Sequence, residues 1–235
     1  MARSRTLRLE SAPAMWRAGI LLLTLALLAC AIVAWAQFEA RARSDAARAQ
    51  QQPGPIDIGF AQAMSRHHQQ AIGMAQLLLD GEPSPLRTLA TMVNRVQLME
   101  LGMMRGWLTL WGEPLVTNRT SMDWMRMGPT APDAALQQYL LDCEQSPTGM
   151  PGLATAEQME QLRQSTGRAR DALFLDLMRA HHEGGLPMAN FAARHARLPV
   201  VRALATQVAY EQTRELHWIQ RTQHAMNASA PSATP

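Results

Sequence analysis

Apolar positions recur at helical spacing along four long segments of the chain, and polar or turn-forming residues separate the segments. The spacing predicts helices over Asp57–Leu79, Leu86–Trp111, Arg168–Ala196 and Pro199–Met226, with Gly112 ending the second of them. Short turns join the helices within each pair, so two helical hairpins are predicted. Four long helices that share one core most naturally form a four-helix bundle, and the predicted fold class is all-α.

The helix pattern also predicts helix ends and a core face. Asp57 and Asp171 lie near the starts of the two hairpins and are predicted N-caps rather than ligands. In the connector, 113–166, a loop leads to Asp133, a candidate cap for a short helix to Cys143. Thr155 followed by Gln158 is a capping-box pattern for another short helix. The candidate buried positions of the second long helix are Leu89, Val93, Val96, Met99, Met103, Trp107 and Leu110.

The N-terminal segment, 1–36, contains the longest apolar run of the chain. Ala18–Ala36 carries no charge and follows several arginines, which is typical of an export signal or a membrane anchor. Its length favours a retained transmembrane helix, whereas Ala34-Trp35-Ala36 resembles a cleavage site and Leu27–Cys30 loosely resembles a lipoprotein signal. In each case the body, 56–226, leaves the cytoplasm and becomes periplasmic. A flexible linker is predicted for 37–55, and a disordered tail for 227–235.

Composition and charge narrow the classes of function. The chain is 47% hydrophobic with 5% aromatic residues, which suits a helical core. The formal charge of +3 comes from the N-terminal arginines, so it indicates membrane targeting and not nucleic-acid binding. Cys143 is the only cysteine beyond the apolar run, so the exported part cannot form an internal disulfide.

One motif occurs twice. The segments FAQAMSRHHQQAIGMA at 60–75 and FLDLMRAHHEGGLPMA at 174–189 share a Phe, a Met, a His pair and a second Met at the same spacing. Gln97-x-x-Glu100 matches Gln212-x-x-Glu215 in the following helices after one inserted residue. Only two copies with so long a period indicate a duplicated hairpin, with repeats at about 57–112 and 167–226.

The repeated residues are potential metal ligands. At helical steps the Met and His side chains of each copy fall on one face, and pseudo-two-fold packing would turn both faces inward. Imidazole nitrogen and thioether sulfur are neutral, soft donors that favour Cu(I) and Ag(I) over hard ions. Thioethers also stay usable as ligands where thiolates would be oxidised. The predicted ligands are Met64, His67, His68, Met74, Met178, His181, His182 and Met188.

Each of these residue types also has a structural explanation. A methionine at helical spacing more often fills a core, as expected for Met99 and Met159, and an isolated histidine is more often hydrogen-bonded structure. Duplication favours metal binding, because the two copies have diverged elsewhere. Glu100 and Glu215 could each orient a histidine or pair with a surface arginine, and the sequence leaves both open. Connector methionines at 122, 125 and 127 are candidates for weaker sites.

Together these residues resemble the domain of unknown function 305 family. The resemblance rests on the repeated Asp-x-x-Phe-x-x-x-Met-x-x-His-His motif, on Gln-x-x-Glu and on Trp107-Leu-x-x-Trp111-Gly112, and it covers about Ile56 to Met226. It implies a ferritin-like four-helix bundle that is exported or lipid-anchored in bacteria. Some members are associated with copper binding and with copper or silver tolerance. The resemblance carries the ligand role to the eight His and Met residues named above.

The chain departs from this family pattern after the second His pair, where Gly184-Gly185-Leu186-Pro187 replaces a smooth helix. Pro187 lacks a backbone donor, so a kink or bulge is expected beside the site. His217 stands where the first copy has Gly102 and is a candidate auxiliary group. The full auxiliary set is Glu100, Met104, Glu215 and His217.

The sequence therefore predicts an exported copper-binding protein and not an enzyme. Its partners would be the metal ion and the membrane, with no nucleic acid. A di-iron enzyme is disfavoured, because the Glu-x-x-His motifs of such bundles are absent. A metal-free helical adaptor that binds another envelope protein remains an alternative. Whether a site forms within one bundle or between the chains of a homo-oligomer is open.

Overall fold

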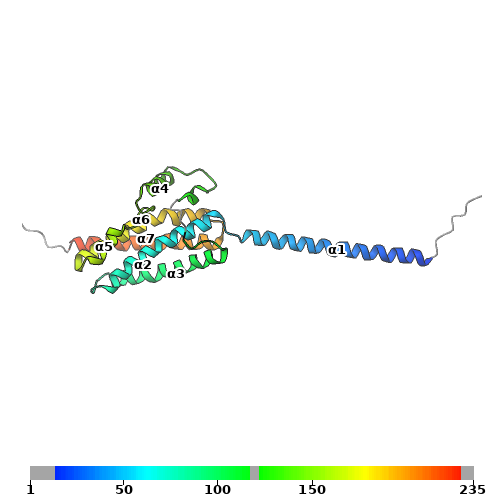
Figure 1. The fold of residues 1–235 in the computed structure, drawn as a ribbon, viewed down its shortest axis with the longest axis horizontal. Helices are drawn as coiled ribbons and strands as arrows, with labels where there is room; N and C mark the ends of the chain where they lie inside the picture. The colour runs from blue at the N-terminus through cyan, green and yellow to red at the C-terminus, as the bar shows by residue number, and fades with distance from the viewer. Residues whose placement is uncertain (1–13, 117–121, 229–235) are drawn as a thin grey trace, which may run out of the picture. The chain divides into compact units, whose positions relative to one another are not determined.

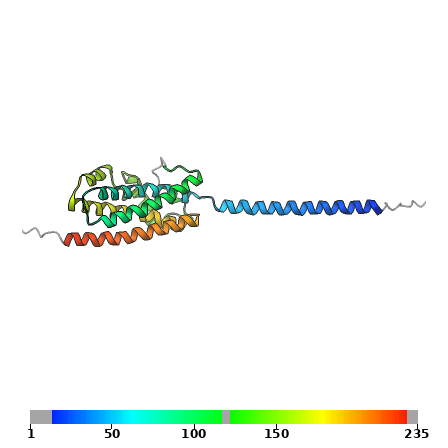
Figure 2. The same ribbon diagram turned by 90° about the horizontal axis from the view of Figure 1, so that it is seen from below.

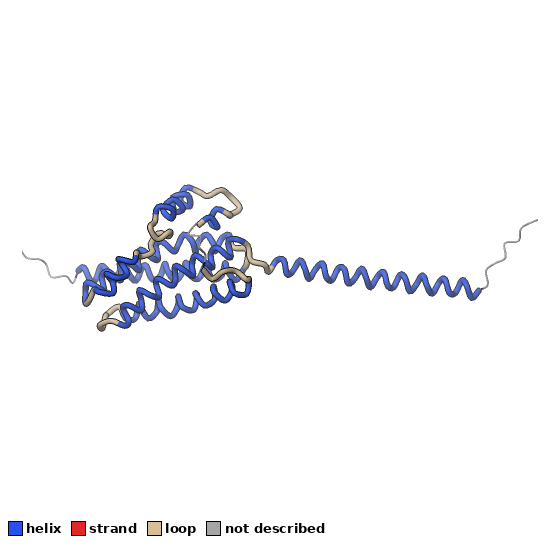
Figure 3. Tube along the Cα trace, viewed as in Figure 1, coloured by secondary structure: helices blue, strands red, loops and turns tan. Residues whose placement is uncertain are grey.

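The computed structural model describes residues 14–116 and 122–228, and these contain helices and no strand (Figure 3). The chain divides into two compact units, Met1–Gln51 and Gln52–Pro235. The all-α class expected from the sequence is confirmed. Residues 229–235 of the predicted tail lie outside the described residues.

The first unit contains one long helix, α1 (Ala14–Gln50). Within it, Trp16–Ala47 is the one stretch among the described residues that is long and apolar enough to cross a membrane. A signal sequence has the same length and composition. The predicted flexible linker is wrong for most of its length, because its alanines and arginines extend α1 to Gln50. Only residues 51–54 separate α1 from the next helix.

Four long helices form most of the second unit. α2 (Pro55–Asp80) pairs with α3 (Arg87–Trp111), and α6 (Gly167–His195) pairs with α7 (Pro199–Ala228). The two hairpins meet where α2 packs against α6 (Figures 1 and 2). The predicted boundaries of these helices are correct to within about two residues.

Three short helices lie in the connector between the hairpins. They are the 3-10 helix η1 (Asp123–Arg126), α4 (Ala134–Gln145) and α5 (Ala156–Gln164). Asp133 caps α4 by accepting the Leu136 N–H at 2.8 Å, and Thr155 and Gln158 form the predicted capping box. These local signals were therefore sufficient to place the helix ends.

Asp57 does not cap α2 as predicted. The N-cap is Gly54, and the buried Asp57 carboxylate lies one turn further on and accepts the Gly54 N–H at 2.8 Å. The same carboxylate accepts the backbone N–H groups of Arg197 (3.2 Å) and Leu198 (2.9 Å) in the turn between α6 and α7. Asp57 therefore holds the turn of the other hairpin.

Asp171 does not cap α6 either, since the N-cap is Thr166 and Asp171 lies inside the helix. Its carboxylate accepts the Ser84 hydroxyl at 2.7 Å, in the turn between α2 and α3. The neighbouring Arg170 donates to the Glu82 carbonyl of that turn at 2.7 Å. Each hairpin thus holds the turn of the other through an aspartate near the start of its first helix.

Replacing Asp57 with Ala is expected to lower the free energy of unfolding by about 3 kcal/mol, because buried backbone donors lose their acceptor. The matched control is Asp133→Ala, which removes an exposed cap and should cost about 1 kcal/mol. Denaturant unfolding of the detergent-solubilised chain measures both. Equal losses would show that the contact between hairpins adds nothing beyond ordinary capping.

The predicted core face of α3 is correct at Leu89 and Val93 and wrong beyond them. Met99 is 57% exposed and Leu110 is 83% exposed. Val96, Met103 and Trp107 are only partly buried. The buried face instead continues through Gln97, Glu100, Met104 and Leu108. Gln97 and Glu100 are polar, so a prediction based on apolar positions alone selects the neighbouring face of α3.

α6 continues as an α-helix through Pro187, so the helix does not end at the position where a kink or bulge is expected. The two preceding glycines allow close contacts. A Cβ at Gly184 would lie 2.0 Å from the carbonyl oxygen of Pro151 in the connector. A Cβ at Gly185 would lie 2.7 Å from Cε1 of His67. The departure from the family pattern therefore brings the connector and a histidine ring against α6.

Candidate metal centre

Two apolar clusters fill the core of the second unit. One cluster contains Met64 and Met188, and the other contains Met74 and Met178. In each cluster, the methionine that precedes one His pair lies with the methionine that follows the other His pair. The helices α2 and α6 therefore run in opposite directions. The histidines lie between these methionines along both helices, in a polar layer that separates the clusters.

The polar layer is closed to solvent. His67, His68, His181 and His182 are each 0% exposed, although histidine is seldom buried so completely. The other members are also buried: Gln97, Glu100, Gln212 and Glu215. The predicted inward orientation of both His pairs is thus observed.

Each buried glutamate accepts a hydrogen bond from one histidine of its own hairpin. His68 Nε2 donates to Glu100 at 2.8 Å, and His182 Nε2 donates to Glu215 at 2.5 Å. The sequence left two roles open for these glutamates, a contact to histidine or a pair with a surface arginine. In the structure both glutamates contact histidine. In the neutral tautomer that donates through Nε2, the lone pair of each of these two imidazoles is on Nδ1.

The other two histidines meet at the centre of the layer. The rings of His67 and His181 lie with centroids 3.6 Å apart, and His181 Nε2 donates to the His67 carbonyl at 2.8 Å. Burial lowers the pKa of the His67 imidazole well below its usual value, and His181 lowers it further. Burial likewise lowers the pKa of His181, as does the nearby His182. Both rings are therefore neutral, with lone pairs available at physiological pH.

Five imidazole nitrogens of the layer have no hydrogen-bond partner: both nitrogens of His67 and Nδ1 of His68, His181 and His182. The side-chain amides of Gln97 and Gln212 also lack partners. Native interiors rarely leave so many polar atoms unsatisfied in one place, so the layer is suited to a bound ligand or ion. Among the described residues, however, no three His, Cys, Asp or Glu side chains are grouped closely enough to hold one metal ion.

The remaining histidines lie outside the layer. The prediction that His217 adds to the site is wrong, because its side chain is exposed. His224 is exposed as well, and His195 packs on the Phe191 ring with centroids 4.7 Å apart. Met104, in contrast, is fully buried in the same cluster as Met64.

Comparison with known proteins identifies the family. A profile described as "Domain of unknown function (DUF305)" matches residues 57–223, nearly all of the helical body. The chain belongs to the DUF305 family. A DUF305 protein from Streptomyces coelicolor, assigned as secreted, is 31% identical, with a TM-score of 0.61 over 73% of this chain and 94% of the other.

Two structures of lower sequence identity share the fold. A DUF305 fragment from Deinococcus radiodurans is 22% identical, with a TM-score of 0.56 over 74% of this chain and 99% of the fragment. CopM in its Cu(I)-bound form is 20% identical, with a TM-score of 0.52 over 74% of this chain and 98% of CopM. No curated protein matches the chain.

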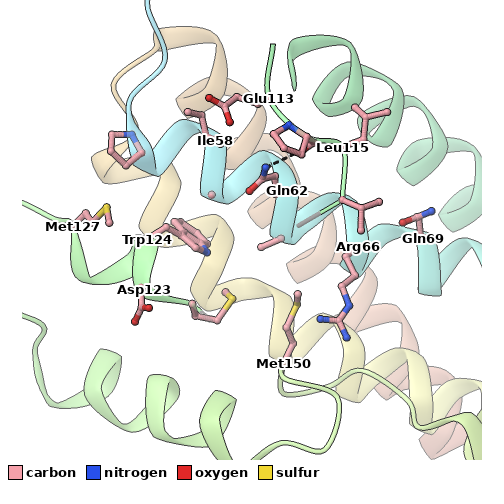
Figure 4. Close-up of a pocket in the computed structure, with 16 residues that line it drawn as sticks. Ile58, Gln62, Arg66, Gln69, Glu113, Leu115, Asp123, Trp124, Met127 and Met150 are labelled. Atoms are coloured by element: carbon pink, nitrogen blue, oxygen red, sulfur yellow. Dashed lines mark hydrogen bonds between the residues drawn. The ribbon is translucent and has the colours of Figure 1, made fainter. Parts of the chain in front are cut away.

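A pocket of about 500 Å³ opens beside α2 of this DUF305 protein, and no histidine lines it (Figure 4). Ile58, Trp124 and Met150 form part of its wall. Two of the connector methionines proposed as weaker sites, Met122 and Met127, also line this pocket, and Met122 and Met125 are buried in the core. The connector methionines therefore do not extend the histidine layer.

Sequence reasoning missed two members of the layer, Gln97 and Gln212. Their signal was present, because the repeat places a glutamine three residues before each of the two glutamates. The sequence pattern indicates only that these glutamines are duplicated, because glutamine is a weak metal ligand and is not expected in a copper site. Their burial beside the histidines makes them part of the site.

Proposed function

We propose that this protein binds Cu(I) outside the cytoplasm, in copper sequestration, tolerance or transfer. His67, His68, His181 and His182 would supply imidazole ligands. Thioethers would come from the clusters on either side of the histidine layer: Met64, Met74, Met178 and Met188. Ag(I), with the same preference for soft neutral donors, would bind the same site.

The observation that carries this proposal is the set of five unpartnered imidazole nitrogens in the closed interior. Each buried polar atom without a partner costs roughly 1–3 kcal/mol of folding stability. A metal ion bound to these nitrogens would offset that cost. The donors are neutral, which suits a singly charged soft cation better than a hard divalent ion. The Glu100 and Glu215 contacts have the usual form of a carboxylate that orients a metal-binding histidine.

Among the described residues, no three His, Cys, Asp or Glu side chains are close enough to hold one ion. Copper binding would therefore need thioether ligands or small side-chain movements. The central His67 and His181 rings are already adjacent, so a low-coordinate ion would need one or two imidazoles and a thioether rather than a cage of four ligands. CopM, which shares this fold, has been observed in Cu(I)-bound and Cu(II)-bound forms, and this supports copper as the metal. The four packed helices would then be the ferritin-like bundle implied by the family resemblance.

We also propose that α1 keeps the protein at the outer face of the inner membrane. Its apolar stretch follows N-terminal arginines, which favour the cytoplasmic side. Cleavage after α1 would instead release a periplasmic protein with the same copper site.

Titration of the purified, detergent-solubilised chain with Cu(I), against a chromophoric Cu(I) chelator under anaerobic conditions, tests the proposal. We expect stoichiometric binding that withstands the chelator, with Ag(I) competing for the same capacity. Failure to bind would instead favour the metal-free adaptor. Iron-dependent oxygen consumption would favour the di-iron alternative, although the layer contains only the two carboxylates of Glu100 and Glu215.

A further inference from the structure

The outer side of α3 carries an apolar stripe beside its core face. Its members, spaced by three or four residues, are Met92, Val96, Met99, Met103, Trp107 and Leu110. Met99 and Leu110 are more than half exposed, and the others are partly buried. A shallow pocket lies over the first part of the stripe, with Arg87 and Arg95 at its border.

The duplicated hairpin provides an internal comparison. With the one-residue insertion, the stripe corresponds on α7 to Gln207, Glu211, Arg214, Trp218, Thr222 and Ala225. Five of these six positions thus lose the large apolar side chain, although the two hairpins have the same fold. The bundle therefore does not require an apolar stripe at this place, and α3 leaves Met99 and Leu110 of the stripe exposed.

The charges of α3 indicate what the stripe contacts. Arg87, Arg95 and Arg105 are its charged residues apart from Glu100, which is 2% exposed and bonded to His68. The accessible charge of α3 is therefore entirely positive. A second copy of α3 would place arginines against arginines, whereas an anionic surface would attract them.

Two tryptophans close the stripe at the C-terminal end of α3. Trp107 and Trp111 stack with ring centroids 6.0 Å apart, and both are partly exposed. Tryptophan is enriched where protein meets the headgroup region of a bilayer, because its ring is apolar while its N–H is polar. An apolar stripe with terminal tryptophans, and with Arg87 and Arg95 at the border of the pocket over it, has the composition of an interfacial helix.

We infer that α3 docks on the surface of a bilayer that contains anionic phospholipid, with the stripe among the headgroups and with Arg87 and Arg95 near lipid phosphates. The inference rests on the proposed membrane anchoring by α1 and not on copper binding. A tether raises the effective concentration of the body at the bilayer, so a contact too weak to hold a free protein suffices. Bilayer docking would also cover the apolar side chains that the fold leaves unburied.

A polarity-sensitive fluorophore tests this docking in the full chain, on a Cys30→Ser background. One variant carries the label at Met99→Cys, and the matched control carries it at Arg214→Cys, the equivalent position of α7. The buried Cys143 is monitored by labelling the background chain alone. Each chain is reconstituted into phosphatidylcholine vesicles with or without phosphatidylglycerol, and flotation of the vesicles reports anchoring.

We expect a blue shift at position 99 that requires phosphatidylglycerol and decreases in high salt, with no shift at position 214. Chains that float but give the same emission at both positions would overturn the docking and leave the anchoring intact. Chains that do not float would overturn the anchoring and the docking with it. Shielding of position 99 in detergent that grows with protein concentration would identify a second copy as the occupant instead.

Discussion

Replacing His67 and His181 together with leucine is expected to weaken Cu(I) binding at least a hundredfold without destabilising the metal-free chain. Leucine is close to histidine in volume, and it removes three nitrogens that have no partner. One hydrogen bond, from His181 to the His67 carbonyl, is lost, which costs about 1 kcal/mol. Removal of the unsatisfied nitrogens offsets that loss, so the free energy of unfolding should be unchanged or higher.

Chelator competition measures the affinity of this variant, and denaturant unfolding without metal measures its stability. The matched control replaces the exposed His217 and His224 with leucine, which should leave Cu(I) affinity at the wild-type value. Opposite effects on stability and affinity are typical of a functional site that is maintained against the preference of the fold. Wild-type affinity in the His67/His181 variant would place the copper site elsewhere.

Replacing Gly184 with Ala is expected to lower the free energy of unfolding by about 3 kcal/mol. The added Cβ would lie 2.0 Å from the Pro151 carbonyl oxygen, and neither backbone can yield as a flexible side chain would. The Gly184 carbonyl also accepts the buried Tyr139 hydroxyl at 2.9 Å, which fixes α4 against α6 at the same point. Thermal or denaturant unfolding of the detergent-solubilised chain gives the difference.

Gly102→Ala is the matched control, because it also adds one methyl group to a helical glycine. Nothing lies within 4 Å of a Cβ at Gly102, so alanine should raise stability by about 1 kcal/mol through its higher helix propensity. The two substitutions should thus change stability in opposite directions. A gain at both positions would mean that the connector does not pack on α6 at Gly184.

Features that depend on neighbouring residues were predictable from the sequence. The four long helices follow from periodicity, and the starts of α4 and α5 follow from Asp133 and from Thr155 with Gln158. The duplication also placed both His pairs on inward faces, because equivalent helices in a two-fold arrangement bury equivalent residues. Local rules and one internal symmetry were therefore enough for the fold class and for the location of the candidate site.

Features that depend on distant partners were not predictable in the same way. Asp57 and Asp171 are residues typical of N-caps, but the partners that they bind in the other hairpin lie 87 or more positions away along the chain. The core face of α3 was displaced because Gln97 and Glu100 are buried only in the company of the histidines. Met99 and Leu110 look like core residues and are exposed, so apolar character alone cannot separate a core from an outer contact face.

The exchange of turn contacts between the hairpins has a consequence for the symmetry of the fold. Asp57 binds the α6–α7 turn and Asp171 binds the α2–α3 turn, so each half supplies what the other half lacks. A single hairpin carrying one such aspartate and one such turn could satisfy both by associating with an identical copy. The contacts between the two halves of the chain are thus those expected of a symmetric dimer of hairpins joined in one polypeptide.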